Sequence, residues 1–256
     1  TQSDRPSNLS NPSGFKIHKG VNLSHWLSQT TEWSHKDKFI TKEDIKLIKS
    51  FGFDHIRLPI DEEELWNEDG NVIMETLQHV KNCLTWCAEF DLRTVIDLHI
   101  LRSHHFNARN FEGKMTLWGD TSAQNNFIKL WENLSDYLKD YPNNMVAYEL
   151  MNEPVAPDHE QWNQLIARAI KIIRKKEPNR VIIFGSNRWQ KAYTFPYLKV
   201  PKGDKNIILS FHTYDPYFVT HYKAFWSPAR FYTGPIQYPG QCIPDTAFKK
   251  YVDKTN

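Results

Sequence analysis

Short apolar runs alternate along this chain with segments of helical spacing, and polar residues follow most of the apolar runs. The central run, residues 145–150, is typical of a buried strand of the kind found in parallel sheets. It is followed by Asn152, Glu153 and Pro154, and the proline ends the strand because it lacks a backbone donor. Five further strands are predicted, at residues 15–23, 53–59, 93–99, 181–184 and 206–214.

The helical segments carry recognisable beginnings and ends. Thr41 and Asp44 have the spacing of an N-terminal capping pair, and Gly52 is placed to end the same helix. Its buried positions are predicted to be Ile45, Ile48 and Phe51. Longer helices are predicted at about residues 73–90, 122–140 and 158–176, with a short one at 245–253. The apolar stripe of the first of these comprises Leu77, Val80, Leu84 and Cys87.

Strands that alternate with helices indicate a parallel sheet with helices outside it. A doubly wound sheet usually has a glycine-rich turn after its first strand, whereas this chain has residues 22–26, Asn-Leu-Ser-His-Trp. The fold class predicted is therefore α/β, a (β/α)8 TIM barrel type, with about six βα units visible. Residues 1–14 are polar and are predicted to be a flexible leader, and residues 15–256 a single barrel domain.

Composition narrows the functional classes. The formal net charge is +2 and no long basic run occurs, which gives no indication of nucleic-acid binding. No apolar run approaches the roughly 20 residues that span a bilayer. Aromatic residues make up 14 % of the chain, including nine Trp, and such rings stack on sugars as well as in cores. Cys83 and Cys87 suit neither a disulfide nor a zinc spacing and are predicted to be buried or idle thiols.

The residues at the predicted strand ends are the candidates for chemistry. Taken singly, each has an ordinary explanation: a lone His is usually structural, and Glu153 could cap the next helix. Together they match the mouth of a barrel that binds a polar ligand. The strand-end residues are Asn22, His25, Arg57, His99, Asn152, Glu153, Asn187, Trp189, His212 and Tyr214.

Five of these segments resemble glycoside hydrolase family 5, the cellulase-like retaining barrels, over about residues 15–240. The matching segments are residues 20–26 (GVNLSHW), 55–59 (HIRLP), 95–99 (VIDLH), 150–154 (LMNEP) and 211–214 (FHTY). The Asn-Glu-Pro motif is short by itself, but these motifs occur in the family's order on successive strands.

The resemblance implies that Glu153 is the general acid/base, which protonates the leaving oxygen and later activates water. Asn152 would hold the 2-hydroxyl of the sugar. Arg57 would orient the nucleophilic carboxylate and keep it ionised, and Tyr214 would donate a hydrogen bond to the same group. A retaining glycosidase needs two such carboxyls about 5–5.5 Å apart. An aromatic mouth favours a protonated acid, and an arginine favours an ionised nucleophile.

The resemblance also implies residues that bind the sugar. His99 and His212 would bind hydroxyls around the cleaved bond. No cofactor and no metal is expected, and the expected partner is a polysaccharide or oligosaccharide. The residues predicted to bind substrate are Asn22, His25, Trp26, Trp189 and Trp226.

The chain departs from the family in one respect. The family's nucleophile is a Glu at the end of the seventh strand, but no Glu follows Tyr214 here. The later acids Asp215, Asp245 and Asp253 lie in predicted turn or helix positions. Three explanations stay open: a piece of a longer catalytic domain, a sugar-binding protein without turnover, or a carboxylate from another arrangement such as a second copy.

A six-strand arc has two open parallel edges, which proteins seldom leave uncovered. We therefore expect self-association through the open side, unless the aromatic segment 218–239 covers it. A monomer by light scattering, with a sharp unfolding transition, would contradict this expectation.

A different class of activity is a metal-dependent hydrolase built on His99, His104, His105 and His212, although no His-x-His occurs at a strand end. Activity that survives a chelator would exclude it. The sequence favours hydrolysis of β-1,4-glycosidic bonds in a β-glucan by a retaining double displacement. Mannan, xyloglucan and mixed-linkage glucan stay open as substrates. The expected location is secreted or periplasmic, with the signal peptide absent from this chain.

Overall fold

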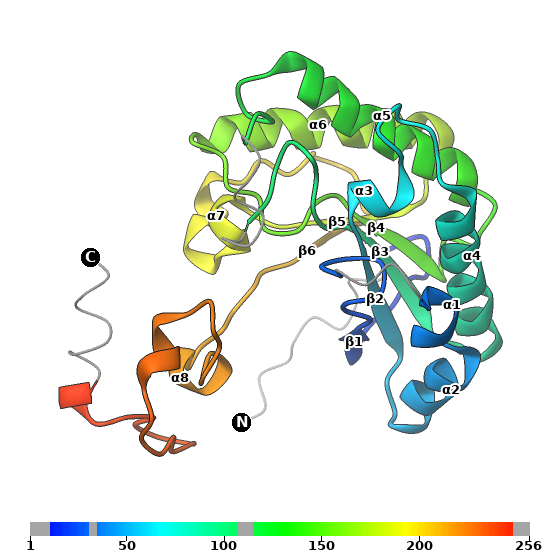
Figure 1. Cartoon of the computed structure of the whole chain (residues 1–256). Coiled ribbons are helices and arrows are strands. Elements are labelled where there is room, and N and C mark those ends of the chain that lie inside the picture. Colours follow the sequence, from blue (N-terminus) through cyan, green and yellow to red (C-terminus); the bar gives the residue numbers. More distant parts are fainter. Residues whose placement is uncertain (1–10, 31–34, 107–114, 248–256) are drawn as a thin grey trace, which may run out of the picture. The chain divides into compact units, whose positions relative to one another are not determined.

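A computed structural model describes residues 11–30, 35–106 and 115–247 of the chain. The chain divides into two compact units, Thr1–Phe211 and His212–Asn256, and each is described by itself. The first unit holds a parallel sheet with helices against one face, as Figure 1 shows.

The strand order settles the architecture of the first unit. All neighbouring strands are parallel and follow one another in chain order, from β1 to β6. A doubly wound sheet changes direction at a switch point, and this sheet has none. The barrel prediction is confirmed for six strands. They are β1 (Gly20–Asn22), β2 (His55–Ile60), β3 (Arg93–Leu98), β4 (Val146–Glu149), β5 (Val181–Phe184) and β6 (Ile207–Leu209).

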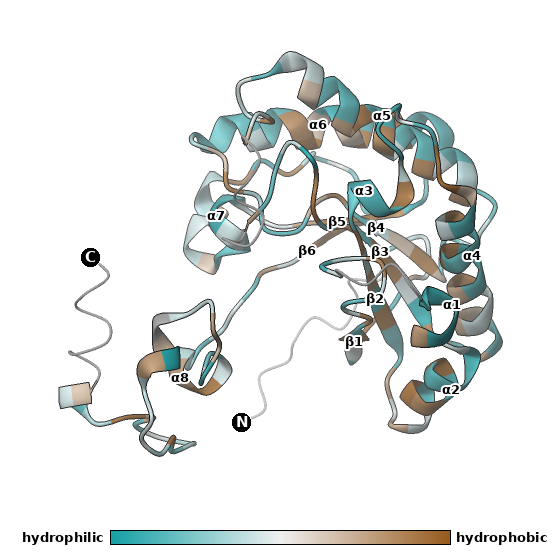
Figure 2. Ribbon diagram, in the orientation of Figure 1, coloured by the Kyte–Doolittle hydropathy of each residue, from teal (hydrophilic) through white to brown (hydrophobic). Residues whose placement is uncertain are grey.

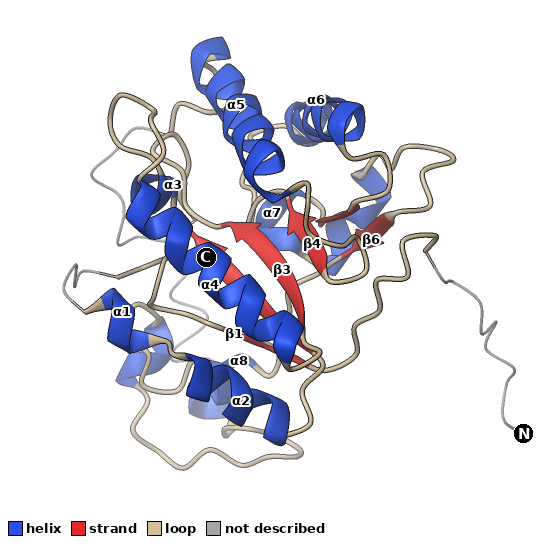
Figure 3. Cartoon of the chain, turned by 90° about the vertical axis from the view of Figure 1, so that its right-hand side faces the viewer, coloured by secondary structure: helices blue, strands red, loops and turns tan. Residues whose placement is uncertain are grey.

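The predicted long helices are present, with ends that shift by one or two residues. Figure 3 shows the helices on the outer side of the strands. The connection from β5 to β6 differs from the predicted alternation, because it contains a short turn, α7 (Asn187–Gln190), and a 3₁₀ helix, η2 (Ala192–Tyr197), in place of a long helix. The remaining helices of this unit are α1 (Lys36–Phe39), α2 (Lys42–Ser50), α3 (Glu62–Leu65), α4 (Met74–Glu89), α5 (Thr121–Leu138) and α6 (His159–Lys176).

The predicted ends of α2 are confirmed in detail. The Thr41 N–H donates to Asp44 Oδ2 at 2.8 Å, which closes the capping box. Gly52 adopts φ +77°, a conformation that glycine accepts at little cost. The predicted burial of Phe51 is wrong, since its side chain is 64 % exposed. It lies at the C-cap, where the chain leaves the helix before the buried stripe of Ile45 can continue.

Two apolar layers hold the sheet in place. The larger lies between strands and helices and includes the predicted stripe of α4, with Cys83 and Cys87 as buried free thiols. Figure 2 shows apolar residues concentrated on the strands and polar residues on the outer faces of the helices. The smaller cluster comprises Phe15, Val95, Ala147, Val181 and Ile183.

Both outermost strands are shorter than predicted. Phe15 is buried in the smaller cluster and does not extend β1, which has three residues. At the other edge, β6 ends at Leu209, and residues from 212 onward belong to the second unit. Among the described residues β1 pairs only with β2 and β6 only with β5, so both sheet edges are open.

A buried ion pair anchors the start of β4. Arg180 is fully buried and donates from Nε to Glu177 Oε2 at 2.7 Å. Its Nη1 donates to the backbone oxygen of Val146 at 2.9 Å, and Ser135 Oγ donates to Glu177 Oε1 at 2.6 Å. The contacts tie α5 and the end of α6 to the strand that carries Glu149.

The second unit has a small core of its own, formed by Phe218, Ala229, Tyr232 and Ile243. Its elements are the short helix α8 (Tyr217–Thr220) and the 3₁₀ helix η3 (Pro228–Phe231). The helix predicted at 245–253 lies for the most part outside the described residues. No helix in the described part of the chain is long and apolar enough to cross a membrane.

Candidate active site

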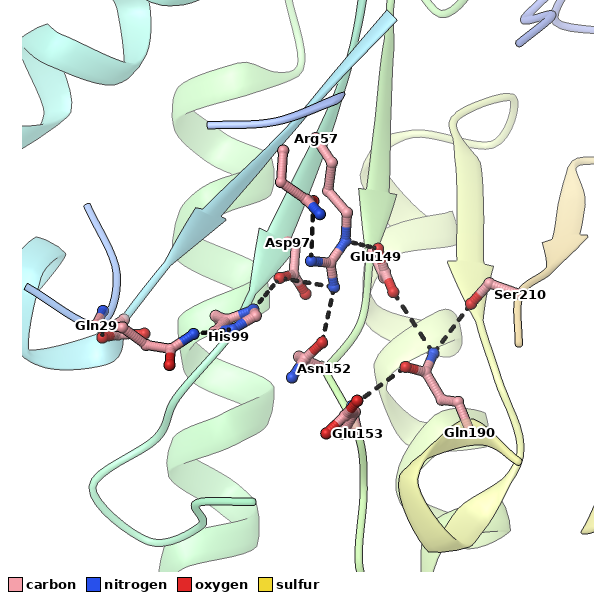
Figure 4. A network of polar contacts seen from close by, with 11 residues as sticks. Gln29, Arg57, Asp97, His99, Glu149, Asn152, Glu153, Gln190 and Ser210 are labelled. Atoms are coloured by element: carbon pink, nitrogen blue, oxygen red, sulfur yellow. Dashed lines mark hydrogen bonds and ion pairs between the residues drawn. The ribbon is translucent and has the colours of Figure 1, made fainter. Parts of the chain in front are cut away.

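A layer of charged side chains occupies the face of the sheet that does not pack against the helices. Arg57 on β2 donates from Nε to Glu149 Oε2 at 2.6 Å, and its Nη2 lies 2.9 Å from Asp97 Oδ2. Asp97 and Glu149 occupy paired positions on β3 and β4, so both carboxylates face the same guanidinium. Figure 4 shows this arrangement at close range. The arginine is thus held by two buried acids from neighbouring strands.

Electrostatics keep Arg57 charged. Burial alone would lower its pKa, but the negative charges of Asp97 and Glu149 outweigh burial and raise the pKa above its ordinary value. The remaining donors of the side chain reach two amides. Nη2 donates to Asn152 Oδ1 at 2.9 Å and Nη1 to Asn22 Oδ1 at 3.3 Å. The cation therefore orients the Asn152 amide beside Glu153.

Glu153 lies just past the end of β4, where the chain turns sharply. The Asn152 N–H donates to the backbone oxygen of Leu98, and Glu153 itself adopts φ 47°. A positive φ is unusual for a residue with a side chain and is typical of functional sites. Both Asn152 and Glu153 are buried, which places an amide and a carboxyl in a region of low water content.

Gln190 connects the two glutamates. Its Oε1 accepts the Glu153 N–H at 3.2 Å, and its Nε2 lies 3.5 Å from Glu149 Oε1 and donates to Ser210 Oγ at 2.9 Å. The side chain is fully buried. Gln190 ends the turn α7, in which residues 188–190 all have φ between 54° and 59°. This left-handed turn aims the glutamine into the site.

The polar network continues on the other side of Arg57. His99 Nδ1 lies 2.6 Å from Asp97 Oδ2, and its Nε2 lies 3.0 Å from Gln29 Nε2. The Phe106 ring meets the His99 ring edge-on, with centroids 5.1 Å apart. Gln29 is half-buried and its backbone N–H donates to Asp61 Oδ2 at 2.8 Å. A continuous chain of polar contacts therefore runs from Gln29 through Arg57 to Ser210 (Figure 4).

The structure brings together five of the residues predicted from the sequence, namely Asn22, Arg57, His99, Asn152 and Glu153. It adds Asp97, Glu149, Gln190 and Gln29, which the strand-end criterion missed. Asp97 and Glu149 could have been recognised in the sequence, because each is the single acid of its strand and follows a run of apolar or aromatic residues. An acid in such a position needs a buried partner.

The aromatic residues predicted to bind sugar differ in their exposure to solvent. Trp26 is 1 % exposed and its Nε1 donates to the backbone oxygen of Lys36, so it is a core residue and offers no ring face to a sugar. Trp189 is 39 % exposed and its Nε1 donates to the backbone oxygen of Phe106 at 3.3 Å. It keeps an accessible ring beside the site. His25 is exposed, with φ 61°, and no described contact joins it to the network.

Three predicted residues, His212, Tyr214 and Trp226, belong to the second unit. Tyr214 contacts His221 edge-on, with ring centroids 5.1 Å apart, and Trp226 is 66 % exposed. The assigned roles of His212 and Tyr214 stay predictions.

One histidine of the metal alternative, His104, contacts the protein backbone. His104 Nε2 accepts the Val155 N–H at 3.2 Å, and burial lowers the pKa of His104 to about 3. This neutral imidazole supports the backbone just after Glu153. Among the described residues, no three His, Cys, Asp or Glu side chains converge on a point that could hold a metal ion.

The fold and this site define an α/β barrel whose mouth carries a buried arginine, two acids and the Asn-Glu pair. The family model of cellulase, glycosyl hydrolase family 5, matches residues 10–254. The chain belongs to this family.

Curated relatives and solved structures agree with that assignment. Endoglucanase C of Acetivibrio thermocellus is 36 % identical over an alignment of 229 residues that covers 87 % of this chain and 65 % of that protein. Cellodextrinase A of Ruminococcus flavefaciens is 34 % identical over 83 % of this chain and 62 % of that protein. The chain thus spans slightly less than two thirds of the length of these relatives.

Among solved structures, Cel5A of Thermotoga maritima, determined in complex with mannotriose, superimposes with a TM-score of 0.74 at 25 % identity. The match covers 96 % of this chain and 78 % of that one. A hyperthermophilic endo-β-1,4-glucanase in complex with substrate gives 0.69 at 29 % identity, over 85 % of this chain and 65 % of that one.

Gly185 makes room for Gln190, and an alanine there should destabilise the protein. A Cβ at this position would lie 2.5 Å from Gln190 Cγ and 2.6 Å from the Ser210 backbone oxygen. We expect Gly185→Ala to lower the free energy of unfolding by about 1–3 kcal/mol in urea titrations. Gly119→Ala is the control, since its Cβ would meet nothing within 4 Å. Equal stability of both variants would contradict this packing.

Burial raises the pKa of Asp61 to about 6, despite the hydrogen bond from the Gln29 N–H. The folded state then binds more protons than the unfolded state between about pH 4 and pH 6, so Asp61 lowers stability as pH rises through this window. Asp61→Asn does not titrate. Its free energy of unfolding relative to wild type should therefore rise by about 2 kcal/mol between pH 4 and pH 7.

Asp54→Asn is the control for this measurement. Burial opposes ionisation of Asp54, but hydrogen bonds from His55 and from the backbone N–H groups of His18 and Lys19 lower its pKa to about 2. Its contribution to stability is therefore lost only below about pH 4. The control should show no change relative to wild type from pH 4 to pH 7. A flat profile for Asp61→Asn would refute the raised pKa of Asp61.

Proposed function

We propose that this chain hydrolyses β-1,4-glycosidic bonds in a β-glucan by a retaining double displacement. The observation that carries the proposal is the site of Glu153 and Asn152, held at the barrel mouth by Arg57 and Gln190. The family assignment and the endoglucanases among the relatives support the same chemistry. The complex of a solved relative with mannotriose leaves mannan open as a second backbone.

The proposed roles combine the family resemblance with the contacts and exposure of the residues. Glu153 acts as general acid toward the leaving oxygen and then as general base toward water. The Asn152 carbonyl accepts from Arg57, so its amide N–H groups are left to bind a sugar hydroxyl beside the acid. Trp189 supplies an accessible ring on which the apolar face of a sugar can stack.

The retaining mechanism also needs a nucleophilic carboxylate close to Arg57. The described carboxylates in contact with Arg57 are Asp97 and Glu149, and both are buried and paired with it. No Glu follows Tyr214 in the sequence. Turnover by this chain is therefore the first quantity to measure.

A polymeric substrate favours an extracytoplasmic location, and we propose that location on this ground. Tagging the protein in its own cells and finding it only in the cytoplasm would contradict it.

The test of catalysis is the release of reducing sugar from a soluble β-1,4-glucan. Glu153→Gln should lower kcat by about 10²–10⁴-fold, the range for a lost general acid/base. An aryl cellobioside with a good leaving group should lose less in its first step, because that group departs without a proton. NMR of the first product should show the β-anomer.

Glu160→Gln is the matched control, because Glu160 is a surface residue of α6 paired with Lys199. It should keep the wild-type rate. A Glu153→Gln protein as active as this control would refute the acid/base role. Wild-type protein that binds cello-oligosaccharide without turnover would instead support a glycan-binding function.

A further inference from the structure

Asp97 joins the two sides of the candidate site. Its side chain is fully buried on β3. One oxygen, Oδ2, lies 2.6 Å from His99 Nδ1 and 2.9 Å from Arg57 Nη2. The strand-end prediction assigned no role to this residue. Its position between Arg57 and His99 lets it act on both through a single atom.

The shared oxygen fixes which nitrogen of His99 carries the proton. Because the Arg57 guanidinium can only donate, Asp97 Oδ2 acts as an acceptor toward both of its neighbours. His99 must then donate from Nδ1, which leaves a lone pair on Nε2. The contact on the other side of the ring agrees, since the Gln29 amide nitrogen, a donor, lies 3.0 Å from Nε2.

We propose that Asp97 is a positioning residue that holds His99 as the Nδ1–H tautomer, so that Nε2 binds a glycan hydroxyl that donates. The inference rests on the proposed function for the identity of the ligand. The tautomer itself does not depend on that function. A histidine held this way selects a hydroxyl by the direction of its hydrogen bond, in addition to its position.

The side-chain amide of Gln29 occupies His99 Nε2, the acceptor that the proposal assigns to a glycan hydroxyl. Its backbone is fixed by the hydrogen bond to Asp61 and adopts φ 53°, which aims the side chain at His99. Gln29 is half-buried, whereas His99 and Asp97 are buried. The Gln29 amide therefore lies at the outer end of the contacts that run from Asp97 through His99, where an incoming hydroxyl can replace it on His99 Nε2.

A simpler role would be charge balance alone, with Asp97 neutralising the buried Arg57. The two roles differ in what they require of the side chain. Charge balance needs the negative charge, so asparagine and leucine would both fail. Positioning needs an acceptor oxygen at Oδ2, which asparagine still provides, because Arg57 orients its carbonyl toward itself and His99.

The experiment measures the His99 tautomer by ¹H–¹⁵N NMR of the imidazole ring, and cellotetraose binding by calorimetry, on the full chain. Wild type should show a protonated Nδ1 and an unprotonated Nε2. Asp97→Leu should populate the other tautomer and weaken cellotetraose binding by about tenfold, the value of one hydrogen bond. Asp97→Asn should keep the wild-type tautomer and most of the affinity.

Asp54→Asn is the matched control, because Asp54 Oδ1 lies 2.7 Å from His55 Nδ1, a similar contact at the amino end of β2. It should leave both His99 and binding unchanged. Equal losses in Asp97→Asn and Asp97→Leu would overturn the proposal in favour of charge balance.

A wild-type His99 protonated at Nε2 would also overturn the proposal, and this measurement needs no variant to fold. If wild-type protein fails to bind cellotetraose, both the proposed function and the claim that His99 Nε2 binds a glycan hydroxyl are refuted. The ring spectrum still decides the role of Asp97 in that case.

Discussion

The buried charge of Arg57 is the constraint on which the rest of the site depends. A guanidinium enclosed by a sheet must be neutralised and must place its donors on acceptors, or it costs several kcal/mol. Here Asp97 and Glu149 supply the charge, and Asn22 and Asn152 accept further hydrogen bonds. These partners come from β1, β3, β4 and the segment after β4, so the register of four neighbouring segments is tied to one side chain. The strand order that makes this a barrel also brings the acids to the arginine.

The same network extends from Arg57 to Glu153 on one side and to Gln29 on the other. Glu149 is linked through Gln190 to the backbone of Glu153, and Asp97 is linked through His99 to Gln29. Both outer ends rest on residues with positive φ, Glu153 and the turn 188–190 on one side and Gln29 on the other. Such conformations persist only where surrounding contacts determine them. The strain is therefore a sign that packing and hydrogen bonds, more than local preference, set the geometry of this mouth.

Sequence periodicity was sufficient for the existence of the six strands and the long helices, and for the five strand-end residues that the site brings together, because these depend on local burial patterns. It did not give the ends of β1 and β6. Glu149 and Asp97 could have been found by the same reasoning, as the single acids of their strands. Gln190 could not, since no glycine in residues 188–190 signals a left-handed turn. Trp26 was misjudged because aromatic residues serve cores and sugar sites alike, and only burial separates the two uses. The burial of Phe51 was predicted wrongly because α2 ends at Ser50, one residue before it, so its side chain leaves the buried face of the helix.

The charge count of the inner layer has a chemical consequence. One arginine faces two carboxylates, so the layer carries surplus negative charge before any nucleophile is considered. A further carboxylate brought beside Arg57 would meet repulsion as well as attraction. Its ionised form must then be stabilised by neutral donors, which act without adding charge. The amide of Asn152 has two N–H groups, so it would be such a donor while also binding the sugar hydroxyl, and Arg57 already orients it. The charge of Arg57 is thus paired with the two buried acids, and its further hydrogen bonds orient the amides of Asn22 and Asn152.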